Sequence, residues 1–256
     1  MVHAAAADTL LRFAYATRPG WPSAAGARIA VLDSSFNPPT RAHLALATLR
    51  DGPREYDAHL LVYSVRNADK GIGSGASLDA RTEMMTCLAK DIESSLRARS
   101  PGYEPNVAVA LVDEPLVFAK STLVHACLQN APRLDWIVGS DTITRVFQEK
   151  YYESLADLQR RSERFFGTEG TRMVCVDRPP AGGAHDDELD ALFATSEVAR
   201  RWRDAGCIKL CTIDATEATY SSTAVREAIS RGSADAARTM LSPSVAVYLS
   251  NSPLYT

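Results

Sequence analysis

The sequence predicts a single α/β domain built on an open, doubly wound parallel sheet. Short runs rich in Val, Ile and Leu alternate with longer amphipathic or polar segments, which is typical of βαβ units. The chain has 256 residues, of which 46% are hydrophobic, so it can bury one sizeable core. With no internal repeat or linker in view, we expect one domain over 1–256, with an extension at 1–27, the sheet and its helices at 28–213, and C-terminal helices at 214–256.

The N-terminal extension is predicted to begin with a short helix that docks on the domain. Its alanine run is followed by Arg18, Pro19 and Gly20, which together end a helix. A mitochondrial targeting segment is the alternative that we do not favour, because the stretch is poor in Ser and Arg and carries Asp8.

The remaining elements follow from apolar patterning. Strand-length apolar runs lie at 28–33, 59–64, 106–112, 134–139, 172–176 and 207–213. Helical patterns lie at 41–50, 78–99, 154–166, 186–204, 223–231, 234–241 and 244–249. Because parallel sheets bind ligands at the carboxyl ends of their strands, we expect the chemistry at strand-to-helix turns.

Composition excludes several classes of protein. The 28 Lys and Arg residues against 31 Asp and Glu residues give a net charge of −3, so no overall positive field attracts nucleic acid or a membrane. The five cysteines are scattered, which argues against a disulfide framework or a structural zinc site and favours reduced thiols in the cytoplasm or nucleus. Apolar runs fall far short of the ~20 residues of a membrane span, so we expect a soluble protein, and a homo-oligomer stays open.

The first predicted strand runs into a proline-rich loop that precedes a helix. Free N–H groups near Ser35 and Phe36 could face a phosphate, as they do at other anion-binding turns. Thr40 and His43 are three residues apart and share one helix face, so both could point at the same anion. A histidine that only caps its own loop is the simpler alternative, but the surrounding residues favour function: Ser34-Ser35-Phe36-Asn37-Pro38-Pro39-Thr40-Arg41-Ala42-His43.

A second candidate motif opens the helix after the last strand. Its hydroxyls, free N–H groups and one guanidinium could converge on a polyphosphate. A plain capping box that includes Glu227 is the alternative explanation of the same residues. The motif reads Tyr220-Ser221-Ser222-Thr223-Ala224-Val225-Arg226.

Two weaker signals end other strands. Gly139 would let a base or ribose approach the backbone, and Asp141 could accept its hydrogen bonds or simply cap the next helix. Lys70 lies in the loop Ser64-Val65-Arg66-Asn67-Ala68-Asp69-Lys70-Gly71, where it suits a phosphate or an exposed surface position.

Taken together, these motifs resemble the nucleotidyltransferases that carry a Thr/His-x-x-His loop and a late ISSTxxR motif. Within that superfamily, the sequence is most similar to nicotinamide/nicotinate mononucleotide adenylyltransferases, whose first loop reads like GSFNPxTxxH. The similarity extends over about 28–249, and the SSFNPPT and NADKG stretches look like a divergent group found in fungi.

The resemblance implies transfer of AMP from ATP to a pyridine mononucleotide, with Mg²⁺ bound mainly by ATP. It implies that His43 and Thr40 hold the ATP phosphates and that Ser222, Thr223 and Arg226 grip the triphosphate, with His43, Thr40 and Arg226 as the catalytic set. Ser35 and Phe36 line the ATP side, and Gly139 and Asp141 contact adenosine. Lys70 meets the mononucleotide phosphate, and Asn37 belongs to the same substrate side. No protein metal ligands are implied.

The sequence departs from the family pattern in two places. The glycine that precedes Ser-Phe is Ser34 here, and the tryptophans that commonly stack on the pyridine are missing. Phe118 or Tyr151 is the expected substitute for the stacking face. Trp21, Trp136 and Trp202 are predicted to pack in the core or on the surface.

Two other functions stay open at this stage. The same chemistry could serve another phosphate acceptor, such as a phosphopantetheine or a phospho-alcohol. Alternatively, the protein could be a nucleotide-binding module that has lost turnover and acts through partners in stress or protein quality control. Retention of both His43 and Arg226 argues against the module.

Overall fold

The computed structural model describes residues 10–22, 24–50, 52, 55–67, 71–72, 75–128, 131–177 and 187–256. Over these residues the strands form a seven-stranded sheet in the order β1-β6-β3-β2-β7-β8-β9. Every neighbouring pair is parallel except β1 with β6. The predicted doubly wound fold is therefore confirmed. The sheet strands are β1 Leu11–Ala16, β2 Arg28–Asp33, β3 Ala58–Ser64, β6 Val107–Val112, β7 Arg133–Gly139, β8 Arg172–Asp177 and β9 Ile208–Thr212, and the pair β4 Arg66–Asn67 and β5 Gly71–Ile72 stands apart.

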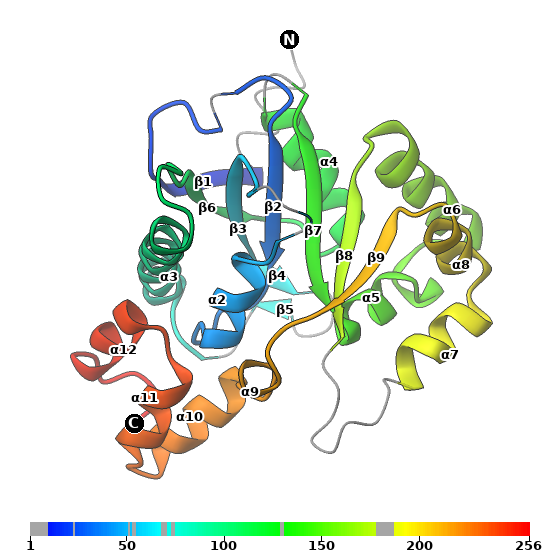
Figure 1. The fold of residues 1–256 in the computed structure, drawn as a ribbon. Helices are drawn as coiled ribbons and strands as arrows, with labels where there is room; N and C mark the ends of the chain where they lie inside the picture. The colour runs from blue at the N-terminus through cyan, green and yellow to red at the C-terminus, as the bar shows by residue number, and fades with distance from the viewer. Residues whose placement is uncertain are drawn as a thin grey trace.

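Helices cover both faces of the sheet (Figure 1). One face packs on α2 Arg41–Ala47, α3 Leu78–Arg99, α10 Ser222–Ser230, α11 Ala234–Met240 and α12 Pro243–Ser250. The other packs on α4 Val117–Cys127, α5 Ser140–Val146, α6 Leu155–Ser162, η2 Glu163–Thr168, α7 Asp187–Thr195 and α8 Glu197–Asp204. The short η1 Glu149–Tyr151 and α9 Ala215–Ala218 complete the described elements.

Burial on both faces of the sheet explains why the strands could be recognised in the sequence as continuous apolar runs. All six residues of β6 are buried, as are the first six of β3. Such strands carry no polar alternation, because helices exclude water from either side. In the described part of the chain, no helix has the length and apolar character needed to cross a membrane.

The strand order reverses at β2, which pairs with β3 on one side and β7 on the other. The chain winds outward from β2 to β6 in one direction and from β7 to β9 in the other. A reversal of this kind leaves a crevice at the carboxyl ends of the two central strands, and ligands of open α/β sheets bind there. The loops after β2 and β7 therefore hold the expected site.

Residues 11–16 correct one prediction. They form the edge strand β1, antiparallel to β6, where a docking helix that ends before Arg18 was expected. Leu11 is buried and the next three residues are exposed, so the stretch has too little apolar pattern to be recognised as a strand. The alanine run before it lies outside the described residues.

Several helix predictions need smaller corrections. The segment 154–166 divides into α6 and the π-helical turn η2, and 186–204 divides into α7 and α8. A break at Ser196 separates the latter two, because the Ser196 hydroxyl caps α8 by accepting from the Ala199 N–H at 3.2 Å. Sequence patterning missed α4, α5 and α9. The proline and glycine pairs at 179–180 and 182–183 lie outside the described residues.

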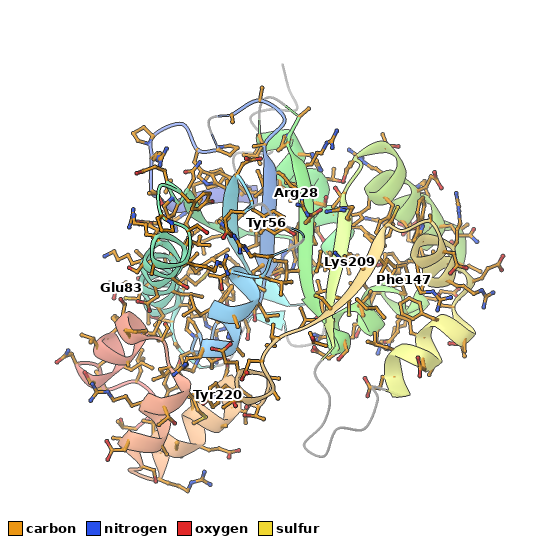
Figure 2. All side chains as sticks on the ribbon, viewed as in Figure 1. Arg28, Tyr56, Glu83, Phe147, Lys209 and Tyr220 are labelled. Carbon is orange, nitrogen blue, oxygen red and sulfur yellow. The ribbon has the colours of Figure 1, made fainter. Side chains whose placement is uncertain are left out.

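A buried carboxylate ties the amino ends of three strands together. Asp135 on β7 is 2% exposed and accepts hydrogen bonds from Arg28 of β2 and Arg172 of β8, at 2.7 Å from each Nη2. The Arg28 guanidinium also lies over the Tyr56 ring at 4.4 Å, and the two side chains lie side by side in Figure 2. These contacts lie at the amino ends of the strands, which is the end of the sheet opposite to the cleft. They align the three strands there.

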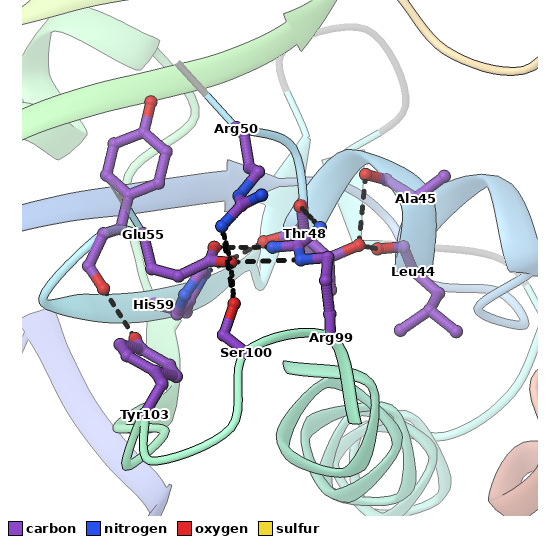
Figure 3. Close-up of polar contacts among 11 residues, drawn as sticks. Leu44, Ala45, Thr48, Arg50, Glu55, His59, Arg99, Ser100 and Tyr103 are labelled. Carbon is purple, nitrogen blue, oxygen red and sulfur yellow. Dashed lines mark hydrogen bonds and ion pairs between the residues drawn. The ribbon is translucent and has the colours of Figure 1, made fainter. Parts of the chain in front are cut away.

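A second polar cluster anchors the carboxyl end of α2 (Figure 3). The Glu55 carboxylate accepts from Arg99 Nη2 at 2.6 Å and from Ser100 Oγ at 2.7 Å. Burial raises the pKa of Glu55, but these hydrogen bonds outweigh burial, so its pKa is below the ordinary value. Arg99 Nη1 donates to the Thr48 carbonyl at 2.7 Å, and His59 Nδ1 donates to the Ala47 carbonyl at 2.9 Å. Helix α2, which follows the proline-rich loop, is thereby held at its carboxyl end.

Candidate active site

A cleft of about 500 Å³ lies at the point where the strand order reverses. Its walls come from the loop after β2, the loop after β7 and the first turn of α10. Tyr220, labelled in Figure 2, stands at the entrance to α10. Two motifs that are far apart in the sequence therefore face one cavity, together with the Gly-x-Asp turn.

His43 is held by hydrogen bonds at both ring nitrogens. The Thr40 backbone N–H donates to Nδ1 at 3.0 Å, and Ser34 Oγ lies 3.0 Å from Nε2. Because Nδ1 accepts from a backbone N–H, the ring proton of the neutral imidazole is on Nε2. His43 therefore caps its own helix through Nδ1, as the simpler interpretation held, and directs the Nε2–H toward the cleft that it lines.

Thr40 and Phe36 do not line the cleft that they were expected to share with His43. Thr40 is fully buried, and its hydroxyl lies 2.9 Å from His43 Nδ1, on the side of the ring turned away from the cavity. Its position supports orientation of the imidazole and leaves it no surface for a phosphate. Phe36 is also fully buried, with its ring 5.3 Å from that of His43, so only its backbone could meet a ligand.

The loop reaches its shape without a glycine at position 34. Ser34 does not have a positive φ, and the left-handed residue is Phe36, with φ of 44°. A non-glycine residue in this region is strained, and its surroundings must hold it there. For Phe36 those surroundings are the sheet core and the imidazole.

The late motif contacts the first loop directly. Ser222 Oγ donates to the Pro38 carbonyl at 2.7 Å, and Arg226 Nη1 donates to the Asn37 carbonyl at 2.6 Å. Arg226 Nη2 also donates to Thr223 Oγ1 at 3.1 Å. Ser221 caps α10 by accepting from the Ala224 N–H, and Ser222 and Thr223, the first two residues of the helix, line the cavity. The motif therefore caps the helix through Ser221, whereas Glu227 takes no part in the cap and pairs with Arg231, and its convergence on an anion stays a prediction.

The Asn37 side chain is seated by residues from two distant segments. Its Oδ1 accepts from the Ala76 N–H at 3.3 Å and from the Tyr255 hydroxyl at 2.7 Å. Gly75 has a φ of 104°, a backbone conformation that favours glycine, and a Cβ there would also overlap the Asn37 amide. Both the backbone conformation and the lack of space therefore require glycine at this position. Asn37 lines the cleft, as its assignment to the substrate side expects, while its Oδ1 already has these two donors.

The Gly-x-Asp turn reaches the cleft from the end of β7. Gly139 is the N-cap of α5, and Asp141 stands in the first turn, so the idea that Asp141 is the cap is wrong. The Asp141 carboxylate is 73% exposed and pairs with Arg145 at 3.2 Å. An exposed carboxylate at the cleft rim remains able to accept from a ribose or an amide.

The far end of the cleft is where a pyridine would need a stacking face. Tyr151 lines the cleft, as do Tyr152, Pro115 and Leu116, so Tyr151 stays a candidate for this face. Phe118 does not serve, because it is 2% exposed and lies among other aromatic rings, the nearest being Phe165 at 5.0 Å. Its ring packs the core beneath α4, which is the correction to its expected role.

Further predicted features can be placed. The rings of Trp21, Trp136 and Trp202 are at most 9% exposed, so the expectation that they pack structurally is confirmed. Lys70 lies outside the described residues, and its predicted contact with a phosphate stays a prediction.

The structure adds charged residues that sequence reasoning missed. Lys120 of α4 pairs with Asp33 at 2.5 Å on the cleft wall, and both side chains are less than a tenth exposed. Arg81 of α3 is 3% exposed and donates to the Ser35 carbonyl at 3.0 Å, which supports the loop from below. A signal for Arg81 existed, because it falls on the apolar face of its helix with Met85 and Leu88. Lys120 carries a similar signal within α4, where it lies three residues after Val117 and four before Val124 on the buried face.

The cleft offers few ligands to a metal ion. Within the part of the chain that the structure describes, no cluster of three or more His, Cys, Asp or Glu side chains could hold an ion. The cleft carboxylates come from different strand ends, since Asp33 is the last residue of β2 and Asp141 lies two residues after β7. Mg²⁺ commonly binds through substrate phosphates, water and only one or two carboxylates, so this wall is compatible with a magnesium–nucleotide complex.

The fold and the cleft define a doubly wound α/β protein with a candidate ligand site at the point where the strand order reverses. No protein-family model matches the chain. A curated protein of Schizosaccharomyces pombe, named "Putative nicotinamide mononucleotide adenylyltransferase", is 29% identical over 220 residues, which cover 83% of this chain and 80% of that protein. The resemblance seen in the motifs is thereby confirmed over most of the sequence.

Solved structures agree with the fold. Plasmodium falciparum nicotinic acid mononucleotide adenylyltransferase, complexed with NaAD, aligns with a TM-score of 0.53, and the same enzyme complexed with APC aligns with 0.55. Each is 14% identical and covers 90% of this chain and 97% of its own. At this identity the match supports the architecture, and the site must be argued from the residues themselves.

Proposed function

We propose that the protein is an adenylyltransferase that transfers AMP from ATP to nicotinamide or nicotinate mononucleotide, giving the dinucleotide and pyrophosphate. The observation that carries this proposal is the direct junction of the two motifs. Arg226 and Ser222 contact the backbone of the loop that presents His43, within 2.7 Å, although more than 180 residues separate them. The activity named for the curated relative supports the same reaction.

The chemistry asked of this cleft is alignment and charge stabilisation. A phosphate oxygen of the mononucleotide attacks the α-phosphorus of ATP, the bond to the bridging oxygen breaks, and pyrophosphate leaves. The His43 Nε2–H, the Arg226 guanidinium and the first-turn N–H groups of α10 are donors for the charge that grows on the phosphate oxygens. Mg²⁺, entering with ATP, would neutralise part of the triphosphate charge.

The two substrates need opposite ends of the cleft. The ATP phosphates fit between His43 and α10, and adenosine fits beside Gly139 and Asp141, where the N-cap of α5 exposes backbone. The mononucleotide then takes the wall with Tyr151, and Lys70 is the proposed partner of its phosphate. Tyr151 provides one aromatic face in place of the missing tryptophans.

Product analysis tests the proposal. Purified protein is incubated with Mg·ATP and with nicotinamide mononucleotide, nicotinate mononucleotide or no acceptor, and the products are separated by chromatography. We expect dinucleotide in at least one acceptor reaction and none without acceptor. ATP binding without dinucleotide would overturn the assignment, and pyrophosphate release with phosphopantetheine or a phospho-alcohol would redirect it to another acceptor.

We further propose that the protein works in the cytoplasm or nucleus. The five cysteines are an odd number and are scattered along the sequence, which argues against a disulfide framework and supports a compartment that keeps thiols reduced. Fractionation of cells that express the full chain tests the location, and recovery in a mitochondrial or secreted fraction would contradict it.

A further inference from the structure

Ser34 occupies a distinctive place beside the imidazole. It follows β2 directly, at the position where the family motif has glycine, and its backbone N–H donates to the Val62 carbonyl at 3.2 Å. This bond extends the β2–β3 ladder and fixes the Ser34 backbone. The N–H is therefore not available to a ligand, whereas the half-buried side chain lines the cleft.

The direction of the hydrogen bond between Ser34 and His43 follows from the other contacts of the ring. His43 Nδ1 accepts from the Thr40 backbone N–H, so Nε2 carries the proton and donates to Ser34 Oγ at 3.0 Å. Ser34 is the acceptor in that bond. A hydroxyl is both a donor and an acceptor, so the Ser34 proton remains to be donated to an acceptor in the cleft.

We propose that Ser34 is a second side-chain donor to the ATP phosphate that His43 binds. In the nucleotide-free protein, the Ser34 oxygen takes the place of a phosphate oxygen and holds the ring in position. When a phosphate oxygen accepts the His43 Nε2–H, the Ser34 hydroxyl rotates and donates to the same phosphate. A glycine at position 34 could do neither. The inference rests on the proposed function in assigning ATP to this cleft.

The expected effect on binding is a difference between two hydrogen bonds. ATP binding breaks the neutral bond between His43 and Ser34 and forms a bond from the hydroxyl to a charged phosphate, which is about twice as strong. Ser34→Ala removes both bonds. The net change predicts that this variant binds ATP about fivefold more weakly than the wild type.

The experiment measures ATP and adenosine dissociation constants by calorimetry, without an acceptor, for the wild type, Ser34→Ala and Ser34→Thr. We expect Ser34→Ala to weaken ATP by about three- to tenfold and to leave adenosine unchanged, because adenosine has no phosphate. Ser34→Thr, which keeps a hydroxyl, should stay within about twofold of the wild type for ATP. Ser94→Ala is the matched control, since the Ser94 hydroxyl bonds only within its own helix α3.

Each other result overturns the inference. Unchanged or tighter ATP binding by Ser34→Ala would mean that the serine only competes with phosphate for His43. Equal weakening of ATP and adenosine would assign Ser34 a purely structural role. Because no acceptor is present, these outcomes are independent of dinucleotide formation, and a failure of the proposed reaction is recognised separately in the product analysis.

Discussion

His59 makes the stability of this protein depend on pH in a defined window. The residue lies on β3, is 1% exposed, and donates its Nδ1–H to the Ala47 carbonyl at the end of α2. Burial is the largest influence and lowers the pKa of His59 to about 4, against an ordinary value of 6.5. Glu55 opposes this shift and Arg99 reinforces it. Among the described residues the buried Nε2 has no hydrogen-bond partner, so a proton there would find no acceptor.

The sign and size of the effect follow from linkage. The unfolded chain takes up a proton at His59 near pH 6.5, whereas the folded chain resists protonation until about pH 4. Between these values the unfolded state binds more protons, so the free energy of unfolding falls as the pH falls. Integration from about pH 7 to about pH 5 predicts a loss of about 2 kcal/mol from this one group.

Urea denaturation of the wild type and of His59→Gln at the two pH values measures the effect. Other titrating groups, including His125 with its lowered pKa, are common to both proteins and cancel in the comparison. We expect the wild type to lose about 2 kcal/mol more than the variant on acidification. Equal losses would refute the reasoning. If the variant does not fold, an NMR titration of the wild type replaces it, and a His59 ring that protonates near pH 6.5 would be the refuting result.

Three further predictions concern the cleft. His43→Ala should lower kcat by about two to three orders of magnitude, the scale for one lost transition-state donor, and a stable variant with normal turnover would remove His43 from the mechanism. Arg226→Ala should mainly raise the ATP KM, because the residue lines the cleft, bonds the loop at Asn37 and is the proposed partner of the triphosphate, and an unchanged KM would count against that role. Tyr255→Phe should cost about 1 kcal/mol of unfolding free energy in urea by removing one donor to Asn37. Since burial raises the pKa of Tyr255 to about 12, against an ordinary value of 10, its contribution to stability should be complete below about pH 10 and be lost as the pH rises toward 12, and a loss in wild type alone below pH 10 would contradict this.

Sequence reasoning reached the fold because the sheet is buried on both faces. An apolar run as complete as that of β6 is typical of a strand covered by helices on either side, and the 22 residues of α3 repeat their apolar positions with helical spacing. The edge strand β1 was missed for the complementary reason. It is mostly exposed, and pairing with β6, almost a hundred residues later, makes it a strand.

The motifs could also be recognised in the sequence, because the local order of residues sets which side chains a strand-to-helix turn can offer to a ligand. The turn with His43 was predicted from its neighbouring residues, and the predicted start of the late helix at Thr223 lies one residue from the observed start at Ser222. Local order does not tell which side chain of a motif faces the cavity. Thr40 lies behind the imidazole and Phe118 lies in the core, although each was a reasonable ligand in the sequence.

The sequence by itself therefore determined the doubly wound sheet and the position of the two motifs at strand-to-helix turns, since these depend on periodicity and short-range spacing. Only the tertiary structure decided that Tyr255 seats Asn37, that Lys120 pairs with Asp33, and that Ser34 meets His43 Nε2. Directed contacts such as these depend on atomic positions set by the packing of the whole sheet, and no spacing rule along the chain encodes them.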